Sequence, residues 1–240
     1  MLKKIPLFII CRDRTSCLLS LINYLEKTGF ENIILVDNNS TYEPLLAYYK
    51  STPHKVECLG TNLGHLCVWE SELYKKYQLS KTKYIVTDPD ILPVEDCPND
   101  FAEYFEEVLY NYPQAMNCGF GLKIDDIPKT NPFRNNIIEC EGKMWNLELA
   151  AGLYNAPIDT TFALYKPLMF YGKTNNFRSQ WAKDISDSIR MSTLRSIRTG
   201  YPYIARHTTW YISKPNEEEL YYIARCQTSN CWSSKYIKRN

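Results

Sequence analysis

No apolar stretch in this 240-residue sequence approaches the length of about 20 residues that a membrane-spanning helix needs. The first residues combine a basic start with a short apolar run, but that run passes directly into charged residues without a small-residue cleavage site. We therefore interpret residues 5 to 11 as a first strand and not as part of a signal peptide. The sequence predicts no membrane span, although peripheral contact with a membrane surface stays open.

Paired cysteine motifs are also missing. The nine cysteines are an odd number, they are scattered singly, and no two of them form a C-x-x-C pair. This pattern argues against a disulfide or zinc framework. It predicts a cytoplasmic protein with reduced thiols.

Lysine and arginine residues form no consecutive run longer than two, and the formal net charge is only +1. Nucleic acid is therefore not a predicted partner. The charge is nevertheless uneven, since residues 166 to 240 carry 13 basic and 5 acidic side chains. One explanation of this excess is chance, with the basic side chains lying on the solvated surface. The other is that they supply positive charge to a phosphate-bearing ligand or to an anionic membrane surface.

Short apolar runs alternate with amphipathic stretches through the first ninety residues. The runs predict strands over 5–11, 32–37, 55–59 and 84–86, and the stretches between them predict helices over 15–28, 42–50 and 66–77. Strands and helices that alternate in this way specify parallel pairing with right-handed crossovers. We predict an α/β fold, a doubly wound and mostly parallel sheet flanked by helices.

The second half of the sequence has a looser pattern. It predicts helices over 101–109 and within 136–149, a strand over 116–122, and a loop that leads into a strand ending at residue 165. Residues 166 to 200 are irregular and aromatic, which makes them a candidate flap. A short strand or turn over 203–211 and a helix over 217–225 follow.

Each of the first four predicted strands ends in polar residues. The segments are CRDR at 11–14, DNNS at 37–40, TNLGH at 61–65 and DPD at 88–90. Carboxyl ends of parallel strands meet at one edge of a sheet, where ligands of open α/β folds bind. The two carboxylates of Asp88 and Asp90 are hard oxygen donors that suit Mg²⁺ or Mn²⁺ with a phosphorylated ligand. Taken alone, the Asp88 and Asp90 pair would be explained by a solvated turn. Four polar strand ends at the same edge of the sheet instead predict a nucleotide site.

The order of these motifs resembles the GT-A glycosyltransferases, especially small ones related to family 2. Members of that family have a basic loop after the first strand, V-D-D-x-S after the second, N-x-G after the third and D-x-D after the fourth. Here the matching segments are CRDR, VDNNS, NLG and DPD, within roughly the first 95 residues. Asn38 replaces the second acid of V-D-D, and the aromatic lid motif of processive synthases is missing. The resemblance implies a single GT-A-like domain over 1–240, with a nucleotide-sugar half over 1–97 and an acceptor half over 98–240.

The resemblance implies roles at the donor site. It implies that Asp37 contacts the base or ribose of a nucleotide sugar, unless Asp37 only caps the next helix. Residues implied to contact the nucleotide sugar are Cys11, Arg12, Arg14, Asp37, Asn38, Asn62, Gly64, Asp88, Arg198 and Arg206. Gly64 is as well explained as an ordinary turn glycine, and a surface salt bridge is an equal explanation for one of the two later arginines. The implied metal ligands are Asp88, Asp90 and His207, with Mn²⁺ or Mg²⁺ as cofactor. The alternative for Asp88 is contact with the ribose or with a metal-bound water. The alternative for His207 is a structural role, as is common for a lone histidine.

An inverting reaction needs a carboxylate that deprotonates the acceptor hydroxyl. Asp159, between an irregular segment and a strand, stands where inverting members place this base. Asp125 and Asp126 are rivals, and a loop cap is the alternative for any of the three. Tryptophan and tyrosine side chains of the second half are expected in the core or stacked on acceptor sugars.

The sequence therefore predicts a metal-dependent, inverting glycosyltransferase of glycan biosynthesis, which moves a hexose or deoxyhexose from a UDP-, dTDP- or GDP-sugar to a glycan or glycolipid hydroxyl. Sugar-phosphate nucleotidylyltransferases are an alternative, although CRDR lacks their glycine-rich loop. Dehalogenase-type phosphatases place D-x-D after the first strand, and here it follows the fourth. A degenerate transferase that only binds nucleotide or glycan is the alternative that is not an enzyme.

Overall fold

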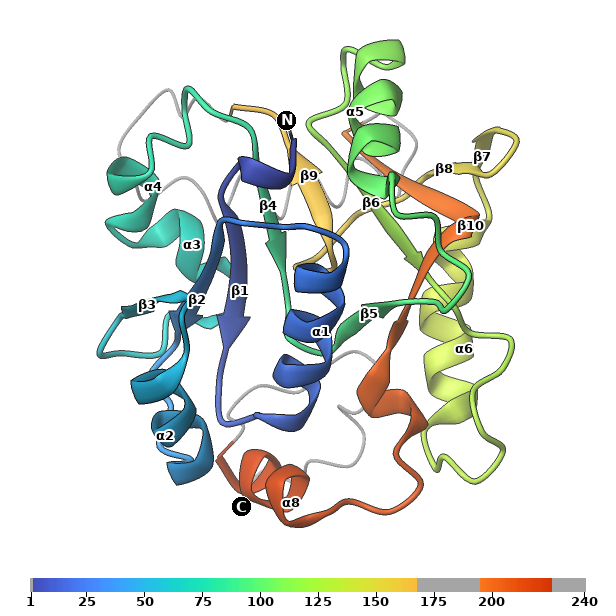
Figure 1. The fold of residues 1–240 in the computed structure, drawn as a ribbon. Coiled ribbons are helices and arrows are strands. Elements are labelled where there is room, and N and C mark those ends of the chain that lie inside the picture. The colour runs from blue at the N-terminus through green and yellow to red at the C-terminus, as the bar shows by residue number, and fades with distance from the viewer. Residues whose placement is uncertain (1, 168–194, 226–240) are drawn as a thin grey trace.

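The computed structural model describes residues 2–167 and 195–225. Most of the flap predicted over 166–200 lies outside these ranges. One ten-stranded sheet runs through the described residues, with helices on both of its faces (Figure 1). The α/β class predicted from the sequence is confirmed.

The strands take up both halves of the chain. They are β1 (Leu7–Cys11), β2 (Ile33–Asp37), β3 (Lys55–Cys58), β4 (Tyr84–Thr87), β5 (Ile91–Pro93), β6 (Asn117–Leu122), β7 (Glu148–Ala150), β8 (Leu153–Asn155), β9 (Ala163–Tyr165) and β10 (Ser196–His207). The described α-helices are α1 (Ser16–Lys27), α2 (Glu43–Ser51), α3 (Cys67–Glu70), α4 (Leu73–Lys76), α5 (Phe101–Asn111), α6 (Arg134–Gly142) and α8 (Glu217–Arg225).

The strand order is β3-β2-β1-β4-β9-β6-β10-β8-β7, and β5 pairs with β10 outside this path. Strands β3, β2, β1 and β4 are parallel, as the alternation of strands and helices predicts. Strand β9 is antiparallel to both β4 and β6, and thereby joins the two halves of the chain in one sheet. The carboxyl ends of the first four strands consequently lie along one edge.

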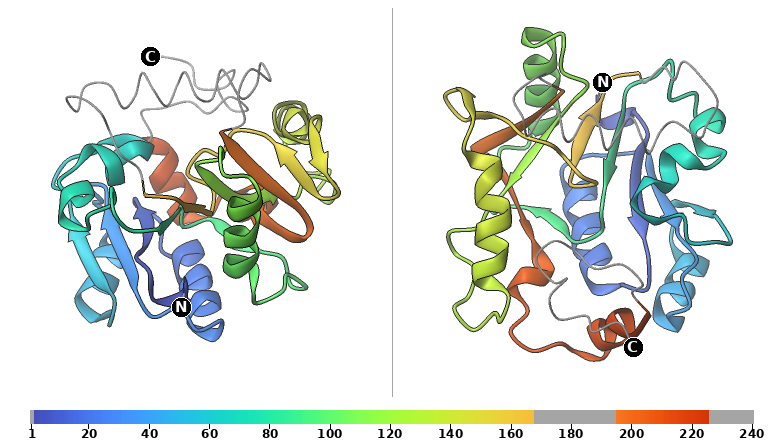
Figure 2. Two further views of the ribbon diagram at one scale, coloured as in Figure 1. Left: turned by 90° about the horizontal axis from the view of Figure 1, so that it is seen from above. Right: turned by 180° about the vertical axis from the view of Figure 1, so that it is seen from behind.

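The sheet has a hydrophobic core on each face. Along β1, Leu7, Ile9 and Cys11 face the core under α1 and α5, and Phe8 and Ile10 face the core under α3 and α4. Figure 2 shows these helices on opposite sides of the sheet. A strand covered on both faces has no solvent side, which explains why residues 5–11 form an almost unbroken apolar run.

One predicted helix differs from the structure, and another is only part of the stretch over which it was predicted. The helix predicted over 66–77 is divided into α3 and α4, because Ser71 has an extended backbone and its hydroxyl accepts the N–H of Leu73 at 3.3 Å. Such side-chain bonds compete with helix continuation. The stretch 136–149 contains the end of α6, a 3₁₀ turn over Lys143–Trp145 and strand β7, which forms a hairpin with β8.

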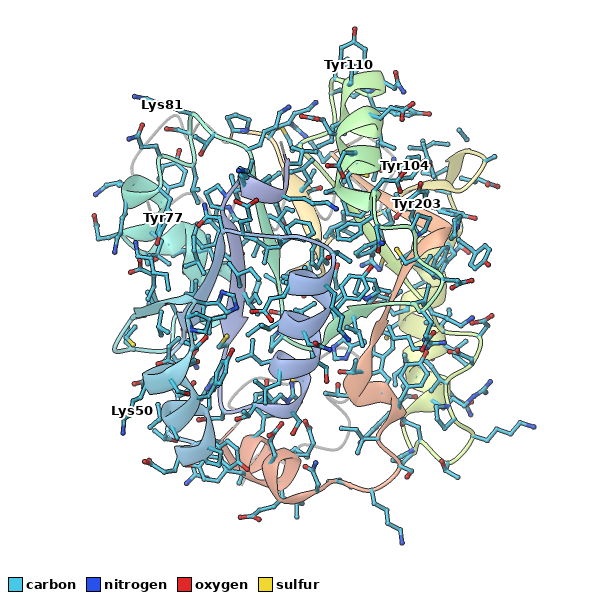
Figure 3. All side chains as sticks on the ribbon, in the orientation of Figure 1. Lys50, Tyr77, Lys81, Tyr104, Tyr110 and Tyr203 are labelled. Atoms are coloured by element: carbon cyan, nitrogen blue, oxygen red, sulfur yellow. The ribbon has the colours of Figure 1, made fainter. Side chains whose placement is uncertain are left out.

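Strand β10 is the largest departure from the sequence prediction. A short strand or turn was expected over 203–211, but the structure has a twelve-residue strand that pairs with β6, β8 and β5. Its register shifts between Thr199 and Ile204, where Gly200, Tyr201 and Pro202 interrupt the ladder. The strand is paired with β6 and β8 before this interruption and with β6 and β5 after it. Beyond them, Tyr203 stacks on Tyr104 of α5 at 4.1 Å (Figure 3).

Candidate functional site

The predicted D-x-D pair lies at the carboxyl end of β4, beside the end of β10. Strand β5 follows the pair directly and runs antiparallel to β10, with Ile91 opposite His207. The carbonyl oxygen of Asp90 accepts the N–H of Thr208 at 2.7 Å. Residues 117 positions apart are thereby brought together by backbone pairing, so the structure places Asp90 and His207 side by side.

Asp90 is buried, with 3% of its surface exposed, and its charge is balanced by Arg14. The Nη1 group of Arg14 donates to Oδ2 of Asp90 at 3.1 Å. The same guanidinium holds Glu219 of α8 through Nε at 2.9 Å and Nη2 at 3.0 Å. Arg14 therefore links the loop after β1, the D-x-D loop and the last described helix.

His207 lies between Asp90 and an aromatic ring. Its Nδ1 is 3.7 Å from Oδ2 of Asp90 and 2.9 Å from the hydroxyl of Thr209. Its ring stacks on Trp210 with centroids 4.6 Å apart. Burial lowers the pKa of His207 below its ordinary value, and Asp90 only partly opposes this effect. A neutral imidazole at neutral pH can act as a ligand or an acceptor.

Asp88 is held by the segment that also carries Asp159. Its Oδ2 accepts the hydroxyl of Thr160 at 2.5 Å, and its N–H donates to the Thr160 carbonyl at 2.8 Å. Burial raises the pKa of Asp88 well above its ordinary value, and the negative charges of Asp90 and Asp159 raise it further. Two buried carboxylates close together repel each other, so the arrangement favours a proton or a cation beside Asp88.

Replacement of Asp88 by asparagine is expected to raise the thermal stability of the ligand-free protein at neutral pH. The folded-state pKa of Asp88 lies above its unfolded value of about 3.9. Between these two pKa values the folded state binds more protons than the unfolded state. The contribution of Asp88 to stability therefore falls as pH rises through that window. Tm measured at pH 5 and pH 8 should therefore fall less with pH for Asp88→Asn than for the wild type. Asp125→Asn is the control, because Asp125 is exposed and pairs with Lys123. Equal pH dependence of wild type and Asp88→Asn would contradict the expectation.

The loops after β1 and β2 are fixed by buried carboxylates. Asp13 is 1% exposed, and its Oδ1 accepts the N–H groups of Thr41 and Tyr42 at 2.6 and 2.9 Å, just before α2. Asp37 accepts the N–H of Ser40 at 3.2 Å and the hydroxyl of Tyr49 at 3.1 Å. Asp37 therefore caps its own turn, whereas the N–H groups just before α2 bond to Asp13, and contact of Asp37 with a base or ribose stays a prediction.

Asn38 joins the loop after β2 to the loop after β3. Its side-chain amide donates to the Gly64 carbonyl at 2.9 Å, and its Oδ1 accepts the N–H of Leu63 at 2.8 Å. Its own N–H donates to the carbonyl of Cys11. Gly64 adopts a φ of +76°, which glycine reaches without strain. An aspartate cannot donate to the Gly64 carbonyl, so the brace explains why asparagine suits this position better than a second acid.

Asn38→Ala is expected to destabilise the protein by about 1–3 kcal/mol, since it leaves the N–H of Leu63 and the carbonyl of Gly64 without these partners. Urea denaturation measures the loss. Asn62→Ala is the matched control, because Asn62 makes one local bond to the same loop, from the N–H of Gly64 at 3.0 Å. A loss for Asn38→Ala no larger than for Asn62→Ala would show that the brace between loops adds nothing.

Other predicted residues lie farther from this cluster or are already bound. The Cys11 side chain is buried in the core, and burial raises the pKa of its thiol. The Nη2 group of Arg12 donates to the Arg225 carbonyl at 3.1 Å. The buried Arg198 pairs with Glu141 at 2.8 Å. Arg206 pairs with Glu95 and Asp126, on the strand face opposite to that of His207.

The donor set of the D-x-D edge fits a hard divalent cation only in part. The carboxylates of Asp88 and Asp90 are the required oxygen ligands, and Oδ1 of Asp90 accepts no hydrogen bond from residues 2–167 or 195–225. In the same residues, no group of three or more His, Cys, Asp or Glu side chains is arranged to hold a metal ion. Two carboxylates with further oxygens from a phosphorylated ligand still form a usual Mg²⁺ site.

Sequence reasoning missed three contributors to this edge. Thr160 anchors Asp88, Thr209 bonds His207, and Glu219 occupies the guanidinium of Arg14. The threonines adjoin predicted segments, but nothing in their spacing indicates which carboxylate or ring they contact. The helix that carries Glu219 was predicted, whereas its docking position depends on the fold.

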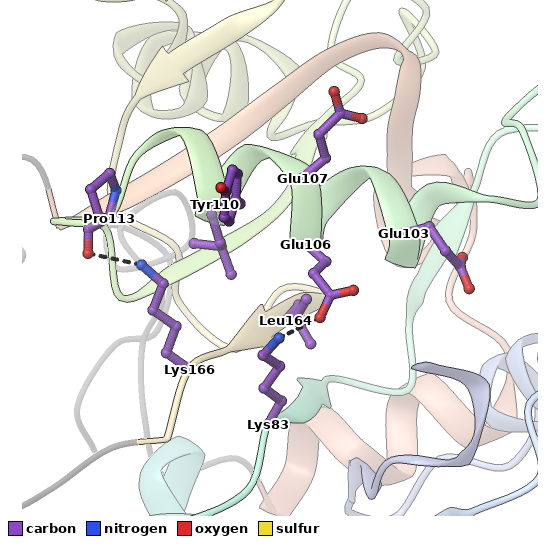
Figure 4. Close-up of a pocket in the computed structure, with 9 residues that line it drawn as sticks. Lys83, Glu103, Glu106, Glu107, Tyr110, Pro113, Leu164 and Lys166 are labelled. Carbon is purple, nitrogen blue, oxygen red and sulfur yellow. Dashed lines mark hydrogen bonds and ion pairs between the residues drawn. The ribbon is translucent and has the colours of Figure 1, made fainter. Parts of the chain in front are cut away.

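A separate hollow of about 670 Å³ lies at the amino end of β4, away from the D-x-D edge (Figure 4). Lys83 and Glu106 form an ion pair on its wall, and Lys166 donates to the Pro113 carbonyl at 2.9 Å. Tyr110 at its rim is 84% exposed. None of the predicted site residues lines it.

The described residues, 2–167 and 195–225, include no helix that is long and apolar enough to span a membrane.

The sequence matches no protein-family model and no curated protein sequence. Similar solved structures include glucosyl-3-phosphoglycerate synthase from Mycobacterium tuberculosis in complex with phosphoglyceric acid, at 12% identity over 92% of this chain and 76% of that one, with a TM-score of 0.48. They also include a 4-diphosphocytidyl-2C-methyl-D-erythritol synthase, at 9% identity over 92% of this chain and 98% of that one, with a TM-score of 0.43. At these identities and TM-scores the likenesses assign no activity to this chain.

Proposed function

We propose that this chain is a metal-dependent glycosyltransferase that moves a sugar from a nucleoside diphosphate sugar to a hydroxyl of a glycan or glycolipid acceptor, with inversion. The observation that carries the proposal is the cluster of Asp88, Asp90, Arg14 and His207 at the carboxyl edge of parallel strands. This is where open α/β sheets bind nucleotides. The cluster combines acids for a divalent cation with a guanidinium for an anion.

In this proposal Asp88 and Asp90 hold Mg²⁺ or Mn²⁺, with His207 beside them. The ion, when bound, supplies Lewis-acid stabilisation of charge on the departing nucleoside diphosphate. Arg14 binds a phosphate oxygen, because a guanidinium pairs with phosphate through parallel N–H bonds. The braced loops at residues 37–41 and 62–64 receive the nucleoside.

Asp159 is the proposed general base. It is exposed beside Asp88, and its carboxylate makes no hydrogen bond or ion pair with the described residues, so it is available to an acceptor hydroxyl. The rivals are less available. Partial burial raises the pKa of Asp126, but hydrogen bonds from Tyr211 and Arg206 bring it below its ordinary value, and Asp125 pairs with Lys123. A base held at low pKa is weak.

A thermal-shift screen of UDP, GDP, dTDP and CMP with and without Mn²⁺ tests the donor site. A nucleotide at about 100 times its dissociation constant adds roughly 2.7 kcal/mol of stability. We expect one nucleoside diphosphate to raise Tm only with the metal. A nucleotidylyltransferase would instead release pyrophosphate from a nucleoside triphosphate and a sugar phosphate, which a coupled assay detects. The absence of any shift would contradict the donor site.

A further inference from the structure

Helix α8 buries charged side chains and not its aliphatic ones against the candidate site. Its only buried residues are Glu218 and Glu219, each 8% exposed. Leu220 and Ile223, on the same helix, are 57% and 55% exposed. No α8 side chain belongs to either hydrophobic core. This is the reverse of an ordinary surface helix, which buries its apolar stripe and exposes its charges.

The two buried glutamates engage groups that attract anions. Glu219 pairs with the guanidinium of Arg14 through two bonds of 2.9 and 3.0 Å. Glu218 accepts the N–H of Ser16 at 3.1 Å and its hydroxyl at 3.0 Å, at the N-terminus of α1. A carboxylate and a phosphate make the same kind of bonds with an arginine and with a helix N-terminus. Glu218 and Glu219 therefore hold the positions that a phosphate group of a ligand would take.

An anionic ligand and the docked helix cannot both use Arg14. Its guanidinium already bonds Asp90 and Glu219, and its face lies 3.6 Å from the Tyr222 ring centroid. A phosphate at this guanidinium would meet the carboxylate of Glu219 at contact distance, with Glu218 and Asp90 close by. Like charges at such distances are strongly unfavourable in a partly buried site.

The contacts that hold α8 in place break at a small cost in free energy. Beside the two glutamates, the hydroxyl of Tyr221 donates to the Thr41 carbonyl at 2.9 Å, and the Tyr221 ring contacts Tyr42 at 4.9 Å. Arg14 lies against the Tyr222 ring, and Arg12 donates to the Arg225 carbonyl. Segments without buried apolar side chains open locally with small free energies. Asn216 directly precedes α8, and its Oδ1 accepts the N–H of Glu219 in the first turn of the helix.

We propose that α8 is an autoinhibitory helix, whose Glu218 and Glu219 occupy the anion positions at Arg14 and Ser16 until a phosphate-bearing ligand displaces them. The inference rests on the proposed function, because it takes the ligand of this edge to be an anion. The apparent dissociation constant of such a ligand equals its intrinsic value divided by the fraction of molecules in which α8 is released. A helix docked in about nine molecules of ten lowers the apparent affinity about tenfold.

The test compares the double variant Glu218→Gln/Glu219→Gln with Glu217→Gln in the full-length protein. Glu217 is exposed on the same turn, so its variant removes a nearby charge without touching Arg14 or Ser16. Calorimetry measures binding of inorganic pyrophosphate and of each nucleoside diphosphate with Mn²⁺. Hydrogen exchange of residues 217–225 reports the release of α8. Asn216→Ala, which weakens the start of α8 and leaves both glutamates in place, guards against a folding defect of the double variant.

We expect the double variant to bind pyrophosphate and the nucleotide about tenfold more tightly than the wild type, Asn216→Ala to show a smaller gain, and Glu217→Gln to show none. Ligand should speed exchange of α8 in the wild type. Equal or weaker binding by the double variant, an equal gain in Glu217→Gln, or unchanged exchange overturns the inference.

The same data separate the two proposals. If pyrophosphate displaces α8 and no nucleotide binds, autoinhibition stands and the proposed function fails. If a nucleotide binds the wild type and the double variant equally, the proposed function stands and autoinhibition fails. If no anion binds any variant, both fail.

Discussion

Asp90→Asn is expected to lower turnover by at least about 10³-fold and to abolish the metal dependence of nucleotide binding. In the proposed site the charge of Asp90 helps to hold the cation, and loss of several kcal/mol of charge stabilisation corresponds to this factor. The amide keeps an oxygen for the N–H of Arg14, and the backbone bond from Thr208 is unchanged. The fold should therefore survive.

Steady-state kinetics at several Mn²⁺ concentrations, together with the thermal-shift screen, measure the effect of Asp90→Asn. Asp96→Asn is the control, because Asp96 accepts a hydrogen bond from the exposed Tyr201 hydroxyl and an amide oxygen can replace it. A variant that keeps its nucleotide shift with Mn²⁺ would place the cation elsewhere. If circular dichroism showed that Asp90→Asn is unfolded, Asp90 would instead have a structural role as the partner of Arg14.

Asp159→Asn is expected to lower kcat by about 10²–10⁴-fold while nucleotide affinity changes little, because a general base acts on the acceptor and not on the donor. Single-turnover assays with saturating donor separate this chemical step from binding. The stereochemistry of the product, read by NMR, must show inversion for the same interpretation. Removal of the Asp159 charge also reduces the electrostatic repulsion on the Asp88 carboxylate, so a small rise in Tm is expected.

Asp125→Asn and Asp126→Asn are the comparison variants for Asp159→Asn. Both aspartates lie beside Lys123 and Arg206 and are occupied by those cations. A loss of kcat at either that exceeds the loss at Asp159 would move the base to that residue. Retention of the anomeric configuration would remove the need for a base altogether.

The first half of the fold was predictable because local pattern and tertiary structure agree there. Residues 7–11 and 33–36 are apolar throughout since each face of the sheet carries a helix layer, and α1 repeats its buried leucines at helical spacing. Where pairing overrides local pattern, prediction failed. The short strand or turn predicted over 203–211 is the end of the long strand β10, which begins at Ser196 and pairs with β6, β8 and β5.

The sequence by itself determined the α/β class, the parallel order of the early strands and the polar ends of those strands, because each follows from periodicity within a short window. Only the tertiary structure decided which of these polar residues meet. The pairing of β5 with β10 brings His207 to Asp90, Thr160 reaches Asp88, and α8 lays Glu219 on Arg14. Contacts between residues about 70 to 200 positions apart are fixed by how the chain closes on itself, and no local pattern of residues encodes them.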